Sequence, residues 1–197
     1  MMHKTLPAIL MLLLAAATQF SCVVRSLPDA GGEPASPVKG CATLDKMPFR
    51  EAWYGMYFKD DKVGYSHFKI EPNGKNFNII SDSVMRLTAL KKTNEIKMKE
   101  KVAVQPDLTL ISFESNVHMN NKDLHMVGKA DGKKFIVDIE VEGEKLTREY
   151  PLEGKIFHSS AISLMPVLRG LRDGEKHSFG VFNAERQGLE KIEQEIS

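Results

Sequence analysis

Seven polar turn signals constrain the fold of this 197-residue chain more than any other feature of its sequence. Each contains Asn, Asp, Gly or Pro, which adopt turn dihedrals at low cost. They lie at residues 59–62, 71–76, 91–94, 105–108, 119–123, 130–134 and 141–145. Between them the residues alternate with the two-residue period of β-strands. Seven turns predict about eight strands in an antiparallel meander, at a spacing typical of a barrel, half-barrel or sandwich.

The alternation also predicts which face of the sheet is buried. Between Thr109 and Met119, one side carries Ile111, Phe113, Val117 and Met119. The other side carries Ser112, Glu114, Asn116 and His118. Phe135, Val137 and Ile139 repeat the pattern, so one face is buried and one is wet, as antiparallel sheets allow.

Residues 158–176 break the two-residue period. Ile162, Met165, Leu168 and Leu171 recur at helical spacing, which predicts a helix near residues 160–171. Ser159 or Ser160 is expected to cap its start, and Gly170 or Gly174 to close its end. Two further strands are expected near residues 177–182 and 187–196. The predicted fold is therefore mainly β, a curved antiparallel half-barrel of about ten strands wrapped on one helix.

Residues 1–21 have the layout of an export signal. His3 and Lys4 precede an apolar run from Leu6 to Ala17, which is too short to span a bilayer as a resident helix. Cleavage after Ala17 suits the ordinary signal peptidase, and cleavage before Cys22 suits lipoprotein processing. We expect lipid at Cys22, which makes the protein an exported, periplasmic or membrane-anchored lipoprotein whose first partner is the membrane.

Residues 22–48 are dense in Pro, Gly, Ala and Ser and poor in large apolar side chains, which predicts a flexible tether ahead of a β domain at residues 49–197. Both cysteines, Cys22 and Cys41, precede that domain, so neither is expected to be a buried nucleophile. Cys41 is an odd thiol if Cys22 is acylated, and the two cysteines are able to pair if the ordinary signal peptidase cuts first.

The charge of the chain argues against a nucleic-acid partner. Lys plus Arg (27) nearly balances Asp plus Glu (26), which leaves a net charge of +1. Lys97, Lys99 and Lys101, beside Arg86, form a local basic stripe without interleaved aromatic residues for base stacking. We expect a solvated strand face whose lysines discourage aggregation, in preference to a contact with anionic lipid headgroups.

The sequence offers no starting residue for catalysis. It contains no Gly-x-Ser-x-Gly elbow, no His-Glu-x-x-His helix and no Gly-rich phosphate or dinucleotide motif, so we expect no catalytic residue and no cofactor. His118 and His125 would face each other if Asn121 and Lys122 form a two-residue turn, with Asp123 as a third ligand. Two imidazoles do not make a selective site, and we expect an exposed polar pair and no metal.

Ten methionines are compatible with two interpretations. Met is ordinary core filler, and it also lines soft apolar cavities that hold acyl chains. A curved sheet capped by one helix makes such a concave apolar space. The candidates to line such a cavity include Met85, Met98, Met119, Met126 and Met165.

The stretch WYGMYFKDDKVGYSHFKIEP, residues 53–72, predicts a regular hairpin. It resembles the start of the accessory domain that precedes the catalytic domain in exported bacterial transglutaminase-like proteins, and the matching residues are Trp53, Gly55, Tyr57, Lys62, Gly64 and Tyr65. Residues 159–183 resemble the helix-then-strand passage of that domain and of exported proteins folded like the lipoprotein carriers. We expect Gly55 and Gly64 to face each other, with the ring of Trp53, Tyr57 or Tyr65 lying across the gap as a structural device.

The resemblance implies a non-catalytic envelope domain with a C-terminal catalytic domain as partner. The family's catalytic Cys, His and Asp lie in that following domain, and no residue here matches them. The alternative is a free-standing half-barrel that binds a lipid, an acyl chain or a lipoprotein. The chain stops within an alternating segment at Ser197, which predicts a longer protein and an unpaired final strand prone to self-association.

Overall fold

The computed structural model describes residues 38–41, 43–58, 60–89, 92–171, 174–184 and 186–195. The predicted export signal, Cys22 and residues 23–37 of the predicted tether lie outside these residues. Within them the chain is mainly β with one short helix, and the large sheet is curved but not closed. The fold class predicted from the sequence is confirmed.

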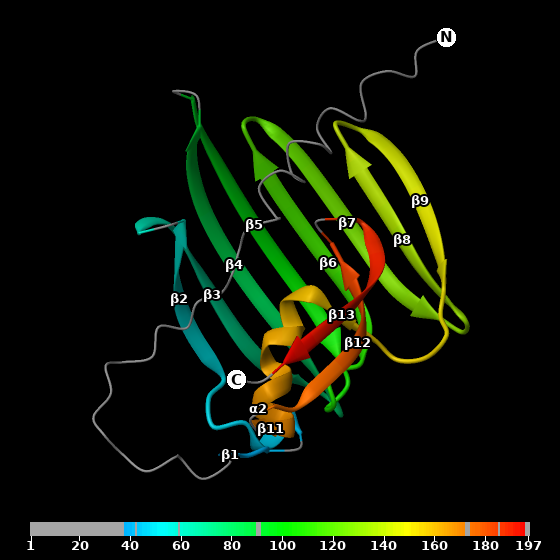
Figure 1. Ribbon diagram of the computed structural model, residues 1–197. Helices are drawn as coiled ribbons and strands as arrows, with labels where there is room; N and C mark the ends of the chain where they lie inside the picture. Colours follow the sequence, from blue (N-terminus) through cyan, green and yellow to red (C-terminus); the bar gives the residue numbers. More distant parts are fainter. Residues whose placement is uncertain are drawn as a thin grey trace.

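Eight strands form one antiparallel sheet in which each strand pairs with the next along the chain (Figure 1). Six of the seven predicted turns connect these strands, because each holds residues that reverse the chain at low cost. The turn predicted at residues 91–94 is misplaced, since residues 92–94 pair as part of a strand with residues 87–89. The strands are β2 (Glu51–Phe58), β3 (Asp61–Asn73), β4 (Asn76–Ala89), β5 (Lys92–Val104), β6 (Leu110–Met119), β7 (Lys122–Asp131), β8 (Lys134–Val141) and β9 (Glu144–Pro151).

A second layer lies against the concave side of this sheet (Figure 1). It consists of β10 (Ile156–His158), the 3-10 helix η2 (Ser159–Leu164), α2 (Met165–Arg169), β12 (Lys176–Asn183) and β13 (Gly188–Glu195). β10 pairs in parallel with β12, and β12 pairs antiparallel with β13. The predicted helix is confirmed, whereas the last two long strands form a separate small sheet and do not continue the half-barrel.

Two residues cap the ends of the helical segment, His158 at its start and Gly170 at its end. The predicted serine cap is wrong, since the imidazole Nδ1 of His158 accepts the hydrogen bond from the Ser160 N–H (3.3 Å). Gly170 closes the segment as predicted, with φ at 91°, a conformation that favours glycine. Pro166 is tolerated because it stands in the first turn of α2, where its missing N–H costs no helical hydrogen bond.

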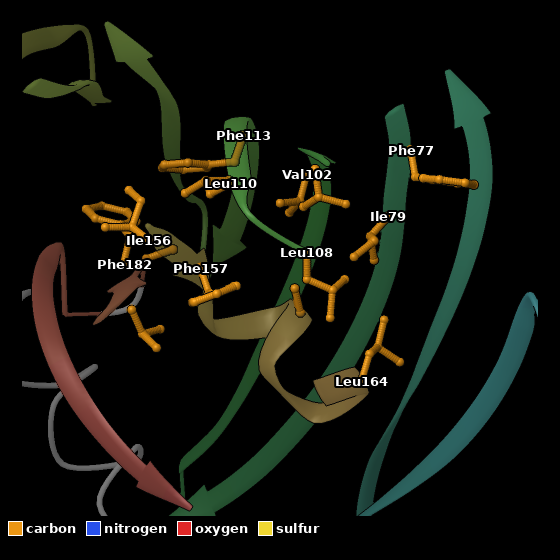
Figure 2. Close-up of a cluster of buried hydrophobic side chains, with 14 of the residues drawn as sticks. Phe77, Ile79, Val102, Leu108, Leu110, Phe113, Ile156, Phe157, Leu164 and Phe182 are labelled. Carbon is orange, nitrogen blue, oxygen red and sulfur yellow. The ribbon is translucent and has the colours of Figure 1, made fainter. Parts of the chain in front are cut away.

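Aromatic side chains join the two layers. Phe113 of β6 lies 5.1 Å from Phe182 of β12 and 4.9 Å from His158 of β10, measured between ring centroids. Phe135 of β8 lies 5.1 Å from the same Phe182 ring. Figure 2 shows side chains of the large sheet meeting those of the second layer across this interface. The core therefore occupies the space between the concave face and the second layer.

The predicted tether is wrong for its last part, because residues 38–41 and 43–48 belong to the folded domain. β1 (Val38–Lys39) pairs with β11 (Gly170–Leu171), and the 3-10 helix η1 (Leu44–Lys46) buries Leu44 completely. Met47 is also buried. Gly40 allows the close approach to α2, since a Cβ there would lie 2.3 Å from the carbonyl oxygen of Leu168. The composition of the predicted tether did not indicate this packing, because only a few apolar residues anchor a largely polar segment to the domain.

Two further predictions about the ends of the domain need correction. Cys41, placed in the tether by its sequence neighbours, is half-buried against the core, and its Sγ lies 3.5 Å from the Val167 carbonyl oxygen. The final strand β13 is not unpaired, because it pairs with β12 over its whole length. Its other edge carries Lys191, Glu193 and Glu195, and such charges oppose pairing with another chain.

Candidate functional site: the open half of the concave face

Side chains on the concave face fall into rows that cross the sheet, because each strand is paired in register with its neighbours. One row lies under the second layer and is fully buried. It runs from Ile79 through Val102, Phe113 and Gly128 to Val137. This row is the floor of the closed half of the concave face.

A second row crosses the same face four residues further along each strand, toward the hairpin ends of β4–β5, β6–β7 and β8–β9. Its side chains are aligned by the pairings Met98–Val117, Val117–Leu124 and Leu124–Val141. All four are apolar, and all four are half-buried although they point to the core side. We call Met98, Val117, Leu124 and Val141 the open row.

Further apolar side chains extend the open row. Met85, Ile96 and Met119 are cross-strand neighbours one step closer to the hairpin ends, and each is half-buried. Leu146 on β9 pairs with Ile139 and is 43% exposed. Soft, flexible methionines at three of these positions suit contact with an apolar group of variable shape. The open half of the concave face is thus a continuous apolar surface. The described residues of the second layer do not fully cover it.

A row of side chains lies between the closed and open halves, polar on β4, β5 and β6 and apolar at Met126 on β7 and Ile139 on β8. It contains Ser81, Glu100 and Ser115, which are direct cross-strand neighbours on β4, β5 and β6. All three are buried, and Glu100 is only 5% exposed. Next to this row, the hydroxyls of Ser66 and Ser83 form a hydrogen bond of 2.8 Å. Along β4, β5 and β6, the concave face therefore has buried polar groups between two apolar regions.

His158 is the most perturbed titratable group of the second layer. It is fully buried against Phe113, its Nδ1 contacts Ser160, and its Nε2 has no hydrogen-bond partner among the described residues. Burial lowers the pKa of His158 from 6.5 to about 4, because the apolar surroundings disfavour the imidazolium. His158 is therefore neutral in the folded protein near pH 7.

This burial predicts a pH-dependent loss of stability. Between pH 6.5 and pH 4 the unfolded chain binds a proton at His158 that the folded chain does not, so stability present above pH 6.5 is lost as pH falls toward 4. From pH 7 to pH 5 the loss from this group is about 2 kcal/mol. Urea unfolding of the wild type and of His158→Phe across this range measures it. If the phenylalanine variant keeps the same slope, His158 is not the titrating group.

The predicted hairpin residues lie on β2 and β3. Gly55 faces Tyr65 and Gly64 faces Met56, so the expected pairing of the two glycines is wrong by one position. The register shifts between Met56 and Tyr57 through a β-bulge, which the sequence did not signal.

Three aromatic residues of the hairpin, Trp53, Tyr57 and Tyr65, lie on the outer face of the sheet, whereas Tyr54 stacks on Phe68 on the concave side (ring centroids 5.6 Å apart). The Tyr57 ring lies over Gly55, where a Cβ would come within 2.7 Å of it. Trp53 stacks on His67 with ring centroids 4.3 Å apart and lies 5.8 Å from Tyr65. The outer rings are on the opposite side of the sheet from the open row, so they form a surface separate from the concave face.

The expected facing of His118 and His125 is wrong because the turn lies one residue earlier. Asn120 and Asn121 form it, with φ of 50° and 66°. His118 then pairs with Asp123 (Nδ1 to Oδ1, 2.7 Å), and His125 with Asn116 (Nδ1 to Oδ1, 2.8 Å). The described part of the chain contains no group of three or more side chains placed to hold a metal ion.

The basic stripe is largely neutralised by its neighbours. Lys97 pairs with Glu95 (2.8 Å), Lys99 with Asp82 (3.6 Å) and Arg86 with Glu95 (2.5 Å). Hydrogen bonds from Lys97 and Arg86 lower the pKa of Glu95 to about 2. A hollow of about 510 Å³ beside these charges is lined by Arg86, Thr93, Glu95, His118, Asn120 and Asn121. Its charged groups already have protein partners, which makes it a weaker binding candidate than the open row.

The chain matches no family model, no curated protein and no solved structure. The resemblance of its hairpin to transglutaminase-like accessory domains therefore stays a prediction. Lipidation at Cys22 also stays a prediction, since Cys22 lies outside the described residues. Within the described residues, no helix is long and apolar enough to cross a bilayer.

Proposed function

We propose that this domain is a binding module that holds an acyl chain, as part of a lipid or a lipoprotein, on the open half of its concave face. The observation that carries the proposal is the open row, whose four apolar side chains point to the core side and yet stay half-buried. Covering them with an apolar ligand stabilises the complex by about 25 cal/mol per Å² of apolar surface removed from water.

The arrangement suits a ligand with one apolar and one polar end. The acyl chain lies along Met98, Val117 and Leu124, across the strands. The buried hydroxyl of Ser115 borders this surface and has no hydrogen-bond partner among the described residues, so a polar group of the ligand can bond to it. Ligand sites are commonly built this way, from a large apolar lining with a few polar groups that set orientation.

The predicted role as accessory domain of a transglutaminase-like protein is compatible with this activity. In that case the acyl-binding surface would act beside a catalytic domain outside this chain. Reading the coding sequence beyond Ser197 tests the prediction. An open frame that encodes a Cys, a His and an Asp in that order supports it, and a stop codon contradicts it.

Val117→Asp is the substitution we predict to weaken acyl binding. Val117 stands in the middle of the open row and is half-buried, so a carboxylate there can remain hydrated in the free protein but loses water under an acyl chain. Titration with cis-parinaric acid, a fluorescent long-chain fatty acid, is expected to show affinity at least about tenfold lower, which equals about 1.4 kcal/mol.

The matched control is Val127→Asp. Val127 belongs to the neighbouring strand β7, is 38% exposed and lies on the opposite face of the sheet. This variant is expected to bind the probe with wild-type affinity. Equal losses in both variants, or no saturable binding to the wild type, would contradict the proposal.

A further inference from the structure

The edge strand β2 differs in chemistry from the other long edge strands. Within the described strands, β2, β9 and β13 each pair on one side only. β9 carries Lys145, Arg148, Glu149 and Pro151, and β13 carries four charged residues, which are ordinary protections of an exposed edge. After Glu51, β2 reads Ala-Trp-Tyr-Gly-Met-Tyr-Phe without a charge or a proline.

The exposed side chains of β2 are large and aromatic. Trp53 is 66% exposed and Tyr57 is 58% exposed, both on the outer face of the sheet. Tyr54 and Phe58 are also exposed by more than a third. Exposed, long and apolar edge strands readily pair with another strand, because their backbone groups and side chains both gain a partner.

One hydrogen bond shows which residues of β2 direct their backbone N–H and C=O groups toward β3 and which direct them to the open edge. The carbonyl oxygen of Arg50 accepts from the N–H of Ile70 (2.7 Å), so Arg50 is a hydrogen-bonded partner of β3. In an antiparallel ladder such residues alternate, which directs Ala52, Tyr54 and Met56 to β3. Trp53 and Gly55 then direct their N–H and C=O groups to the open edge.

The open edge of β2 is also regular. At the β-bulge, Met56 pairs with Gly64 and Tyr57 with Lys62, so the extra residue, Val63, belongs to β3. On β2, residues that direct their backbone groups to β3 and residues that direct them to the open edge therefore alternate without interruption. A second strand can therefore follow this edge over most of its length.

We infer that β2 pairs antiparallel with β2 of a second copy of this chain, about a two-fold axis at Gly55. Antiparallel partners must both direct their hydrogen-bonding groups to the shared edge, so odd-numbered residues of β2 face odd-numbered ones. The two Gly55 residues then lie opposite each other, and Trp53 lies opposite Tyr57 of the second copy. The large sheets of the two copies become one continuous sheet.

Self-complementarity selects a second copy as the occupant. Gly55 adds no side chain of its own at the axis, where the Tyr57 ring of each copy lies over it, and each exposed Trp53 gains a further aromatic neighbour, a favourable cross-strand pair. The same register sets Tyr54 opposite Met56 on the other face. A two-fold interface requires this kind of match, since the same patch must fit itself.

Residue-resolved amide hydrogen exchange and light scattering on the full chain test this inference. Between about 1 µM and about 1 mM protein, we expect the scattering mass to rise to twice that of one chain. Over the same range the exchange of the Trp53 and Gly55 amides is expected to slow at least about tenfold. The Ala52 and Tyr54 amides, which bond to β3, are expected to be protected at every concentration.

Trp53→Lys provides the variant test, because lysine on an edge strand opposes pairing and Trp53 is too exposed for its loss to unfold the domain. We expect it to remain a single chain across the range. Val127→Lys, the same kind of change on an interior strand of the same face, is expected to dimerise like the wild type. A wild type that stays monomeric, or equal dissociation by both variants, would overturn the inference. So would protection of Trp53 and Gly55 that does not depend on concentration.

Discussion

Leu168→Asp is expected to unfold the domain. Leu168 lies in α2, is 4% exposed and belongs to the core between the two layers. An aspartate there either buries an unpaired carboxylate or pulls α2 away from the sheet, at a cost above about 4 kcal/mol. Because domains of this kind are stable by only about 5–15 kcal/mol, little folded protein is expected to remain.

The measurement is thermal unfolding followed by circular dichroism, with Ser163→Asp as the matched control. Ser163 stands in η2, five residues before Leu168, and is exposed, so its substitution is expected to change stability by less than about 0.5 kcal/mol. If Leu168→Asp melts like the wild type, the helical segment does not belong to the core and the two-layer account fails.

Gly128→Ala is expected to lower stability by about 3 kcal/mol, although it adds a single methyl group. A Cβ at Gly128 would lie 2.2 Å from Cε1 of Phe113. The Phe113 ring cannot retreat easily, because Phe135, Phe182 and His158 contact it. Urea unfolding of the variant measures the loss, and Phe113→Leu in the same molecule is expected to recover part of it.

Gly180→Ala is the control for this prediction. Gly180 is also a strand glycine, in β12, but the nearest atom to a Cβ there is the Lys155 carbonyl oxygen at 3.6 Å, an ordinary contact. The change is expected to be neutral or slightly stabilising, because alanine restricts the unfolded chain more than glycine does. Equal destabilisation by both substitutions would show that close packing at Gly128 is not the cause.

Local patterns were sufficient to predict the large sheet from the sequence. Turn residues and two-residue alternation act between neighbours in the chain, and a meander pairs each strand with the next, so every pairing was local. The exact position of the Asn120–Asn121 turn does not follow from local patterns. Several residues of that loop suit a turn, and a choice one residue away changes which partner His118 faces.

Non-local contacts were the features that the sequence did not predict. β12 and β13 have ordinary strand patterns, and only their contact with Phe113 and Phe135 places them in a second layer. Leu44 and Met47 are anchored by the β5–β6 loop and the core, through contacts such as the Leu44 N–H to the Pro106 carbonyl oxygen (3.1 Å).

The open row was visible in the sequence only as ordinary inward-facing residues. Its half-exposure depends on how far the second layer reaches along the strands, which is a property of the assembled fold. The methionines offered the one available signal, since an acyl cavity was among the interpretations of their number. The structure places Met85, Met98 and Met119 on the open half, and Met126 and Met165 in the buried core.

Acyl binding at the open row is tested most directly by methyl NMR with a stearic acid that carries a nitroxide near its methyl end. The nitroxide broadens the signals of methyl groups close to the bound chain. We predict strong broadening for Met98, Val117 and Leu124, and a sharp signal for Val127 on the opposite face. Sharp signals from all four residues, or equal broadening of Val127, would contradict the proposed binding site.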